Sequence, residues 1–243
     1  MKYFLFSDPH GNLTALREAL SNAGYDEDNL NHHLVGLGDY FDRGSENSEM
    51  ANFIIEKYFQ GRSTFLRGNH DQMLIDVLEK RDDGLFNCEH NGLGRTIEDL
   101  SKDKWHMLIQ DQDYTINRIN KNYPKLLEVL NQMKDTLEIK DFILTHGGYS
   151  NTENNPYDTS AWVVNNWAHT ENFVRYFATS DIFNISKTYI FGHWHAFSLR
   201  HVFLGDTGKI THEPFIYRNF IGLDACTTIT NKVNIYIIDE DLV

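Results

Sequence analysis

The sequence has few cysteines, fewer basic than acidic residues, and no long apolar run. Its two cysteines, Cys88 and Cys226, lie far apart and outside any Cys-x-x-Cys pair. This excludes a disulfide framework and predicts two free thiols in a reducing compartment. Lysine and arginine total 22 against 35 aspartate and glutamate, a formal net charge of −13. A generic binder of nucleic-acid backbones is usually basic, so nucleic acid is not an expected partner.

The apolar runs are too short for a membrane protein. None approaches the roughly 20 consecutive apolar residues of a membrane-spanning helix. The N-terminus passes from Met1 and Lys2 through the apolar run 3–6 to Asp8, so no secretory signal is expected. We therefore expect a cytoplasmic protein, of a bacterium or a phage-infected cell, with no membrane partner. The chain of 243 residues, 41% hydrophobic and 23% charged, suits a single globular domain over residues 1–243.

The order of local patterns predicts an α/β fold. In the first 80 residues, β-prone runs alternate with helical patterns, which implies βαβ units and a mostly parallel sheet. The middle of the chain is polar and helical, and it predicts a helical cap or insertion at about 80–140. The later strand patterns predict a second, antiparallel sheet. The expected strands are 2–7, 33–37, 63–66, 141–145, 188–191, 198–204, 220–223 and 233–238, and the expected early helices are 13–22, from 45 or 48 to 58, and from 71 onward.

Five polar segments follow five of the expected strands. In open α/β sheets, ligands bind beyond the carboxyl ends of the strands, so these segments can converge on one site. Taken singly, each has an ordinary explanation such as a capping group, a charged loop or a buried histidine. Together they supply mixed carboxylate, amide and imidazole ligands. The segments are 7–12, 38–44, 66–71, 145–148 and 192–195.

The ligands divide into two sets of four that share Asp39. Such mixed oxygen and nitrogen ligands suit Mn, Fe or Zn better than calcium, so the expected cofactors are two of these metal ions. A metal-bridging hydroxide is then expected to attack phosphorus in a phosphate ester. The first set is Asp8, His10, Asp39 and His195, and the second is Asp39, Asn69, His146 and His193.

The remaining polar residues of these segments are candidates for catalysis. His70 is expected to protonate the leaving oxygen, with Asp71 holding its other ring nitrogen. Arg43 and Arg67 are expected to bind phosphate oxygens with their guanidinium groups. Asp42 is a further catalytic candidate, and a simple ion pair with Arg43 is the alternative explanation for it.

The segments Asp-x-His-Gly, Gly-Asp-x-x-Asp-Arg-Gly and Arg-Gly-Asn-His-Asp resemble the calcineurin-like metallophosphoesterase superfamily. Within it, they are most similar to the serine/threonine phosphoprotein phosphatases of bacteria and phages, especially over residues 65–76. The resemblance implies a four-layer α/β/β/α sandwich with the metal site at the loop end of the sheets. It also implies phosphoserine/phosphothreonine protein phosphatase activity on a phosphorylated protein or a small phosphate ester.

Three positions depart from that branch. Asp71 replaces the glutamate that usually follows Asn-His, and His195 adds a second histidine to the last motif. Residues 162–170 correspond to a loop that usually carries an arginine, but they contain none, and the nearest is Arg175. These departures leave open a symmetrical dinucleoside-tetraphosphate hydrolase or another nucleotide phosphoesterase. A metal-binding regulatory protein without activity is a further alternative, which the presence of His70, Arg43 and Arg67 disfavours.

Overall fold

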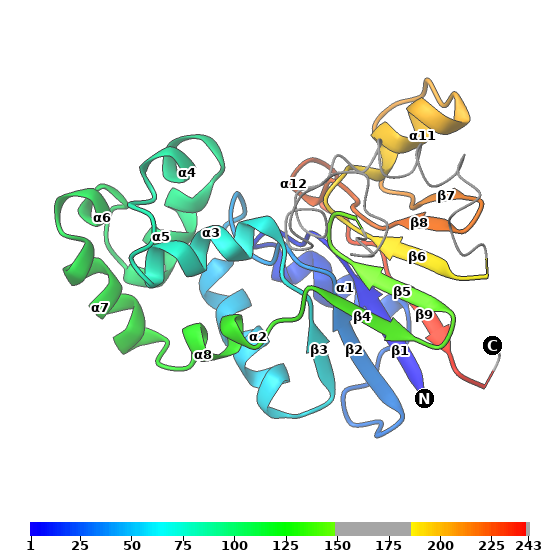
Figure 1. Cartoon of the computed structure of the whole chain (residues 1–243), viewed down its shortest axis with the longest axis horizontal. Coiled ribbons are helices and arrows are strands. Elements are labelled where there is room, and N and C mark those ends of the chain that lie inside the picture. The colour runs from blue at the N-terminus through cyan, green and yellow to red at the C-terminus, as the bar shows by residue number, and fades with distance from the viewer. Residues whose placement is uncertain (149–185, 242–243) are drawn as a thin grey trace, which may run out of the picture.

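The computed structural model describes residues 1–148 and 186–241 and contains two β-sheets (Figure 1). The first sheet has the strand order β3-β2-β1-β9. Its first three strands run parallel, joined by helices, and β9 pairs antiparallel with β1. The elements are β1 (Lys2–Phe6), α1 (Leu13–Asn22), β2 (His32–Gly36), α2 (Asn47–Phe59), β3 (Ser63–Phe65), α3 (Asn69–Leu78) and β9 (Tyr236–Asp239).

The second sheet has the strand order β4-β5-β6-β8-β7. Strands β5, β6 and β8 run parallel, and antiparallel strands flank them on both edges. Helix α11 follows β6, and the short helix α12 follows β8. The elements are β4 (Thr136–Ile139), β5 (Phe142–Thr145), β6 (Thr188–Phe191), α11 (Ala196–Leu204), β7 (Phe215–Tyr217), β8 (Phe220–Gly222) and α12 (Thr227–Thr230).

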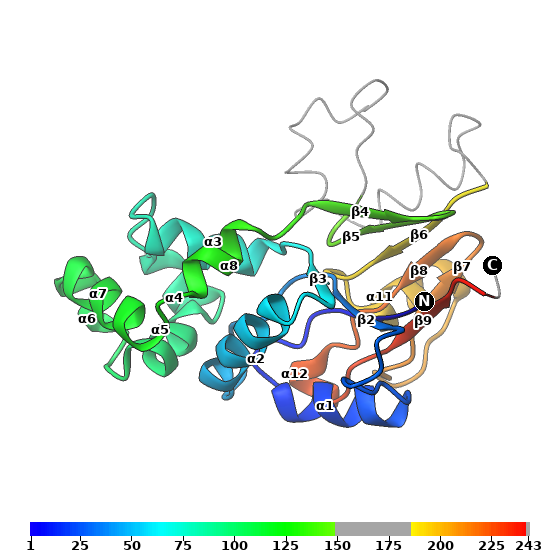
Figure 2. The same cartoon turned by 90° about the horizontal axis from the view of Figure 1, so that it is seen from below.

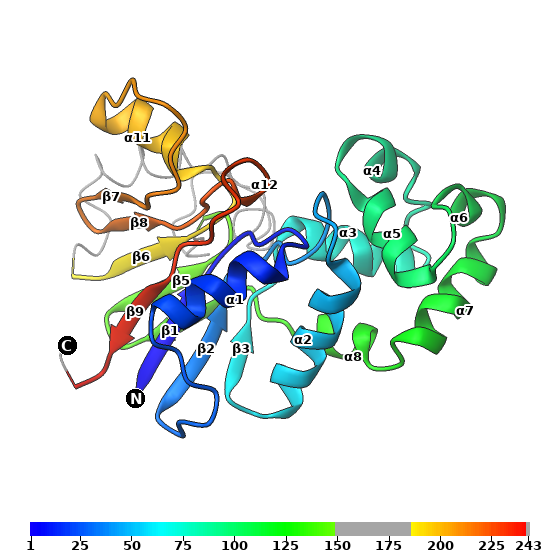
Figure 3. The same ribbon diagram turned by 180° about the vertical axis from the view of Figure 1, so that it is seen from behind.

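Alternation along the strands separates three hydrophobic layers. In β1, Phe4 and Phe6 pack with α1 and α2 on one face, whereas Leu5 faces the second sheet and joins a cluster with Leu144 and Ile190. A third cluster lies between the second sheet and α11. Helices α1 and α2 thus cover the outer face of the first sheet (Figure 2). Helix α11 lies beside β7 (Figure 3) and packs on the outer face of the second sheet. The expected α/β/β/α sandwich is confirmed.

Five helices between α3 and β4 form the inserted segment, which lies to one side of the sheets (Figure 1). Helix α5 packs against α2 and α3, and buried side chains of the segment continue the cluster on the outer face of the first sheet. The second sheet begins at residue 136, within the range 80–140 expected for the insertion. The single-domain description stays a prediction. The helices are α4 (Leu85–His90), α5 (Leu93–Ser101), α6 (His106–Gln110), α7 (Gln112–Asn122) and α8 (Leu126–Asn131).

Three expectations about the fold are wrong. Residues 198–204 lie in helix α11 rather than in a strand. The strand expected at 233–238 is β9, and it belongs to the first sheet. The second sheet is mixed rather than antiparallel. Both cysteines are buried and free, as expected. No helix in the described ranges has the length and hydropathy needed to cross a membrane.

Candidate metal and phosphate site

The polar loops at the strand ends have an unusual backbone. Six of the expected site residues that they carry are non-glycine residues with left-handed φ angles between 43° and 73°. Each such conformation costs on the order of 1–3 kcal/mol and persists only where its surroundings enforce it, which is typical of functional sites. These residues are Asp8, His10, Asp39, Asp42, Arg43 and His193.

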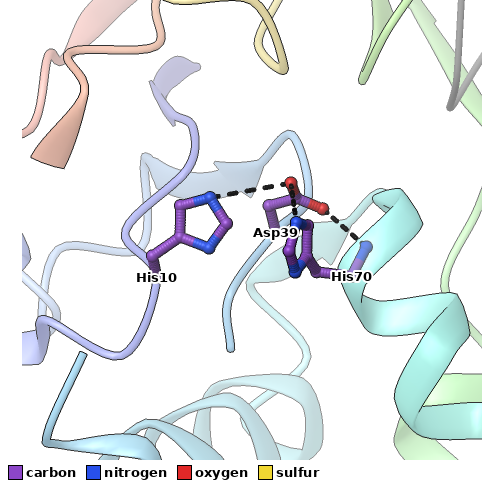
Figure 4. Close-up of side chains that lie close together, drawn as sticks. All are labelled: His10, Asp39 and His70. Carbon is purple, nitrogen blue, oxygen red and sulfur yellow. Dashed lines mark hydrogen bonds and ion pairs between the residues drawn. The ribbon is translucent and has the colours of Figure 1, made fainter. Parts of the chain in front are cut away.

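Asp39 stands at the centre of the site, and on one side it faces two histidines (Figure 4). Its Oδ2 lies 3.7 Å from His10 Nε2 and 4.0 Å from His70 Nε2. The backbone N–H of His70 also donates a hydrogen bond of 3.0 Å to Asp39 Oδ1. All three side chains are buried. Their ligand atoms are close enough together to hold a metal ion.

On its other side, Asp39 faces a second pair of histidines. His146 Nε2 lies 3.3 Å from Asp39 Oδ1 and 3.1 Å from Asn69 Oδ1. The ring of His193 lies 5.1 Å from that of His146, and Asp39, His146 and His193 form a second group that could hold a metal. The structure thus brings together the whole second ligand set expected from the sequence, and Asp39 belongs to both groups.

Two of these imidazoles have one nitrogen engaged and the other facing Asp39. His10 Nδ1 lies 2.8 Å from the carbonyl of Phe41, and His146 Nδ1 lies 2.8 Å from the carbonyl of Leu37. A carbonyl only accepts, so each Nδ1 carries a proton and the Nε2 atom is the one available to a metal. Histidine ligands are usually oriented in this way. The residues present therefore fit metal binding.

Electrostatics gives each group one basic and one neutral histidine. Burial alone would lower the pKa of His146, but Asp39 outweighs burial and raises it to about 10. Burial, with the neighbouring His146, lowers the pKa of His193 to about 3. On the other side, burial and His70 hold the pKa of His10 well below its usual value. Burial lowers the pKa of His70 too, but Asp39 and Asp42 raise it more, and it lies above its usual value.

Asp42, and not Asp71, holds the second nitrogen of His70. His70 Nδ1 lies 2.7 Å from Asp42 Oδ2. The Asp71 carboxylate instead accepts the backbone N–H groups of Gly68, Asp39 and Tyr40 at 2.8–3.0 Å. Asp71 lies in the first turn of α3, where a carboxylate readily satisfies free backbone donors. The role expected for Asp71 is therefore wrong, and that role falls to Asp42.

The two candidate arginines differ in their surroundings. Arg43 Nη1 donates to His10 Nε2 at 3.1 Å, and Arg43 Nη2 lies 3.0 Å from His70 Nε2. Arg67 Nη2 instead donates to Asp135 Oδ1 at 2.8 Å, and Arg67 does not line the cavity that contains Arg43. The phosphate-binding role expected for Arg67 stays a prediction, and in this structure its guanidinium is paired with Asp135. Residues 162–170 and Arg175 lie outside the described ranges.

Asp8 and His195 lie next to the groups around Asp39, together with an aspartate that the sequence reasoning missed. The Asp8 carboxylate accepts the backbone N–H of His193 at 3.0 Å. His195 is partly exposed, and its Nε2 lies 3.9 Å from Asp224 Oδ2. Burial and Asp224 raise the pKa of Asp8 well above its usual value. Asp224 follows strand β8 by two residues, so the strand-end rule used for the other segments could have found it.

A cavity of about 540 Å³ opens over both histidine groups, since His10 and His70 of one and His193 of the other line it. Metal-ligand candidates, Arg43 and apolar side chains all line it, so an anionic group and an organic substituent could bind together. Part of its wall comes from the inserted segment at Asn91. The lining residues are His10, Asp39, Arg43, Asn69, His70, Met73, Asn91, His193, Trp194, His195, Ser198, Cys226, Thr228 and Ile229.

The four-layer sandwich and the two histidine groups that share Asp39 define a metal-dependent hydrolase of the phosphoesterase class. The sequence profile of the calcineurin-like phosphoesterases matches residues 1–197. The chain belongs to the calcineurin-like phosphoesterase family. No curated protein matches the chain in sequence.

Solved structures with the same fold carry different activities in their descriptions. A candidate diadenosine tetraphosphatase is 14% identical with a TM-score of 0.54, over 98% of this chain and 89% of its own. A cold-active protein tyrosine phosphatase of a psychrophilic Shewanella species is 18% identical with a TM-score of 0.54, over 99% and 76%. A protein serine/threonine phosphatase from Saccharomyces cerevisiae is 12% identical with a TM-score of 0.51, over 92% and 67%. At these identities the likeness concerns the fold alone.

Proposed function

We propose that this protein is a dinuclear metal-dependent phosphomonoesterase acting on phosphoserine and phosphothreonine in proteins. One observation carries the proposal. Asp39 is shared by two histidine groups, and the Arg43 guanidinium lies between His10 and His70 in the cavity wall. A carboxylate with a histidine group on each side suits a pair of metal ions, and a guanidinium beside them suits the phosphate.

The metals would be held by His10 and Asp39 on one side and by Asp39, Asn69, His146 and His193 on the other. Asp8 and His195 would complete the first side. Two ions bound there would supply Lewis acidity and a water of lowered pKa, and Mn, Fe or Zn would suit these ligands.

The chain's own residues would bind the phosphate and move the proton. Arg43 would turn its two donors from the histidines to the phosphate oxygens. His70 would give the Nε2 proton to the leaving oxygen, and Asp42 would hold Nδ1 and stabilise the protonated ring. The raised pKa of His70 supports this role, because the acid must carry a proton near neutral pH.

A symmetrical dinucleoside-tetraphosphate hydrolase is the second candidate. Trp194 lines the cavity beside His193 and His195, and an indole is a surface on which a nucleobase can stack. The fold likeness to a candidate diadenosine tetraphosphatase is compatible with this substrate. Other nucleotide phosphoesters belong to the same alternative, and a metal-binding regulatory protein without catalysis is the third candidate.

A substrate panel on protein of measured metal content tests these candidates. The expected result is turnover of para-nitrophenyl phosphate with Mn²⁺, loss of turnover on chelation, and recovery when Mn²⁺ is restored. Phosphoserine and phosphothreonine peptides should then be cleaved with higher kcat/KM than diadenosine tetraphosphate. The reverse preference would establish the nucleotide hydrolase. If the protein binds Mn, Fe or Zn but turns over no substrate with any of them, the remaining candidate is a metal-binding regulatory protein.

A further inference from the structure

Helix α5 of the inserted segment reaches into the catalytic loop through Thr96. Thr96 is fully buried. Its hydroxyl donates to Asp42 Oδ1 at 2.5 Å and accepts the backbone N–H of Asp42 at 2.9 Å. One hydroxyl can do both, because it has one proton and two lone pairs. A threonine 54 positions along the chain therefore fixes both the backbone and the carboxylate of Asp42.

The two oxygens of Asp42 serve two different partners. Oδ1 accepts from Thr96, and Oδ2 accepts from His70 Nδ1 at 2.7 Å. The carboxylate is fully buried, where an oxygen without a partner is costly. A hydrogen bond to each oxygen also sets the plane of the carboxylate. The orientation of the His70 ring thus depends on the helix that carries Thr96.

The same helix region supports the strained backbone next to Asp42. Asp42 and Arg43 have φ angles of 73° and 65°, two successive conformations that each cost on the order of 1–3 kcal/mol. Asn47, the first residue of α2, links the loop at Asp42 to helix α5. Its Oδ1 accepts the backbone N–H of Asp42, and its Nδ2 donates to Asp99 of α5. Gly92, just before α5, lies against Arg43. A Cβ at Gly92 would stand 2.8 Å from the backbone nitrogen of Arg43.

We infer that Thr96 is a positioning residue for proton transfer to the leaving group, an inference that rests on the proposed phosphoesterase function. In the hydrolysis, a water oxygen bonds to phosphorus and the bond to the leaving oxygen breaks. That oxygen takes the proton from His70 Nε2, and a proton of the water later restores His70. Thr96 acts by holding Asp42, and through it His70, in the geometry for this transfer. The inserted helices therefore support the catalytic machinery in addition to lining the cavity.

Leaving-group dependence tests the inference. Para-nitrophenolate leaves easily and needs little help from an acid, whereas phenolate needs more. With the Mn²⁺-loaded protein, Thr96→Val should lower kcat for phenyl phosphate by roughly 10–100-fold but for para-nitrophenyl phosphate by less than about 3-fold. KM and metal content should not change. Thr96→Ser keeps the hydroxyl and should restore kcat.

Thr115→Val is the matched control. Thr115 is also a buried threonine of the inserted segment, but its hydroxyl donates to the carbonyl of Asp111, away from the site. This control should leave the ratio of the two substrates unchanged. If Thr96→Val does not fold, Thr96→Cys replaces the hydroxyl by a weaker donor and should give a smaller shift of the same kind.

A spectroscopic readout separates this inference from the proposed function. The proton on His70 Nδ1, hydrogen-bonded to a buried carboxylate, should give a downfield NMR signal that is absent in His70→Asn. Thr96→Val should shift or broaden that signal and Thr96→Ser should keep it, whether or not the wild-type protein turns over any substrate. An unchanged signal in Thr96→Val would overturn the inference, as would an equal loss of kcat on both substrates. Absence of wild-type turnover would overturn only the proposed function.

Discussion

The two sides of Asp39 have the same kind of ligands but different surroundings. On the His146 side, His146 and Asn69 are buried beside Asp39 while His193 is partly exposed, and His146 is fixed by a backbone carbonyl. On the His10 side, Arg43 and the Asp42–His70 pair surround the ligands. Arg43 and His70 line the cavity, which also reaches Asn69 and His193 of the other side. The first arrangement offers ligands for an ion. The second has donors left over for a substrate.

This difference indicates how the two sides would divide the work. The side with more ligands would hold its metal firmly, and the arginine side would receive the phosphate and the leaving group. Asp39 is the one residue common to both, so changes at Asp39 should affect both sides and changes elsewhere should affect one.

Asp39→Asn should have the largest effect. An amide cannot supply two anionic oxygens, so metal binding on both sides should fail. We expect less than one metal ion per chain and a fall in kcat/KM of at least about 10³-fold, the loss of several kcal/mol of transition-state stabilisation. Metal analysis and steady-state kinetics measure both, and Asp28→Asn on the exposed surface is the control. Full metal content in Asp39→Asn would contradict the shared-ligand description.

His70→Asn and His10→Asn should separate a catalytic from a ligating histidine on the same side. We expect His70→Asn to lower kcat by roughly 10²–10⁴-fold with metal content intact. His10→Asn should lose one metal ion. Both rings are buried and 4.9 Å apart, which makes them a matched pair. Loss of metal from His70→Asn would show that His70 is a ligand and would remove its assignment as the acid.

Arg43→Lys should raise KM by about tenfold with a smaller change in kcat, because a lysine keeps the charge but loses the paired donors. The same change at Arg67 is the control. Arg67 bonds to Asp135 and does not line the cavity, so Arg67→Lys should leave KM nearly unchanged. Equal effects at the two positions would mean that Arg67 reaches the substrate after all.

The smallest expected effect is a difference between the two sides in the protons released when a metal binds. With a pKa of about 10, His146 carries a proton at pH 7 that a metal must displace, whereas the lowered pKa of His10 leaves that ring neutral. Protons compete with metal, so affinity on the His146 side should rise roughly tenfold per pH unit between about pH 6 and 8. Titration of the protein with metal in weak buffer should detect the proton displaced from His146. The same proton should be released in His10→Asn, which keeps the His146 side. Metal binding without proton release would count against the difference.

The strand-end rule predicted most of the site from the sequence. Asp39 follows β2 and His146 follows β5, two apolar strands that are readable locally. Parallel pairing aligns strand ends within each sheet, and packing of the two sheets brings the two edges together. The rule predicts where these side chains lie but does not predict their hydrogen-bond partners. Asp71 and Arg67 both lie within three residues of His70 in sequence, yet Asp71 binds backbone N–H groups and Arg67 binds Asp135. These directions depend on contacts that no local pattern contains.

The other errors have similar physical causes. Over residues 198–204, Leu199 and Phe203 are spaced for a helix, but a run this short also fits alternation along a strand. Strand β9 pairs with β1 from the opposite end of the chain, a choice made by tertiary packing. Thr96 lies in a polar helical stretch without a motif, and only the fold places its hydroxyl against Asp42.

Electron paramagnetic resonance of the Mn²⁺-loaded protein tests the shared site most directly. Two Mn²⁺ ions with a common carboxylate ligand interact magnetically. The predicted result is two Mn²⁺ per chain with an exchange-coupled spectrum that Asp39→Asn abolishes. A spectrum of one isolated Mn²⁺ per chain, or of two that do not interact, would contradict the claim that Asp39 joins two metal sites.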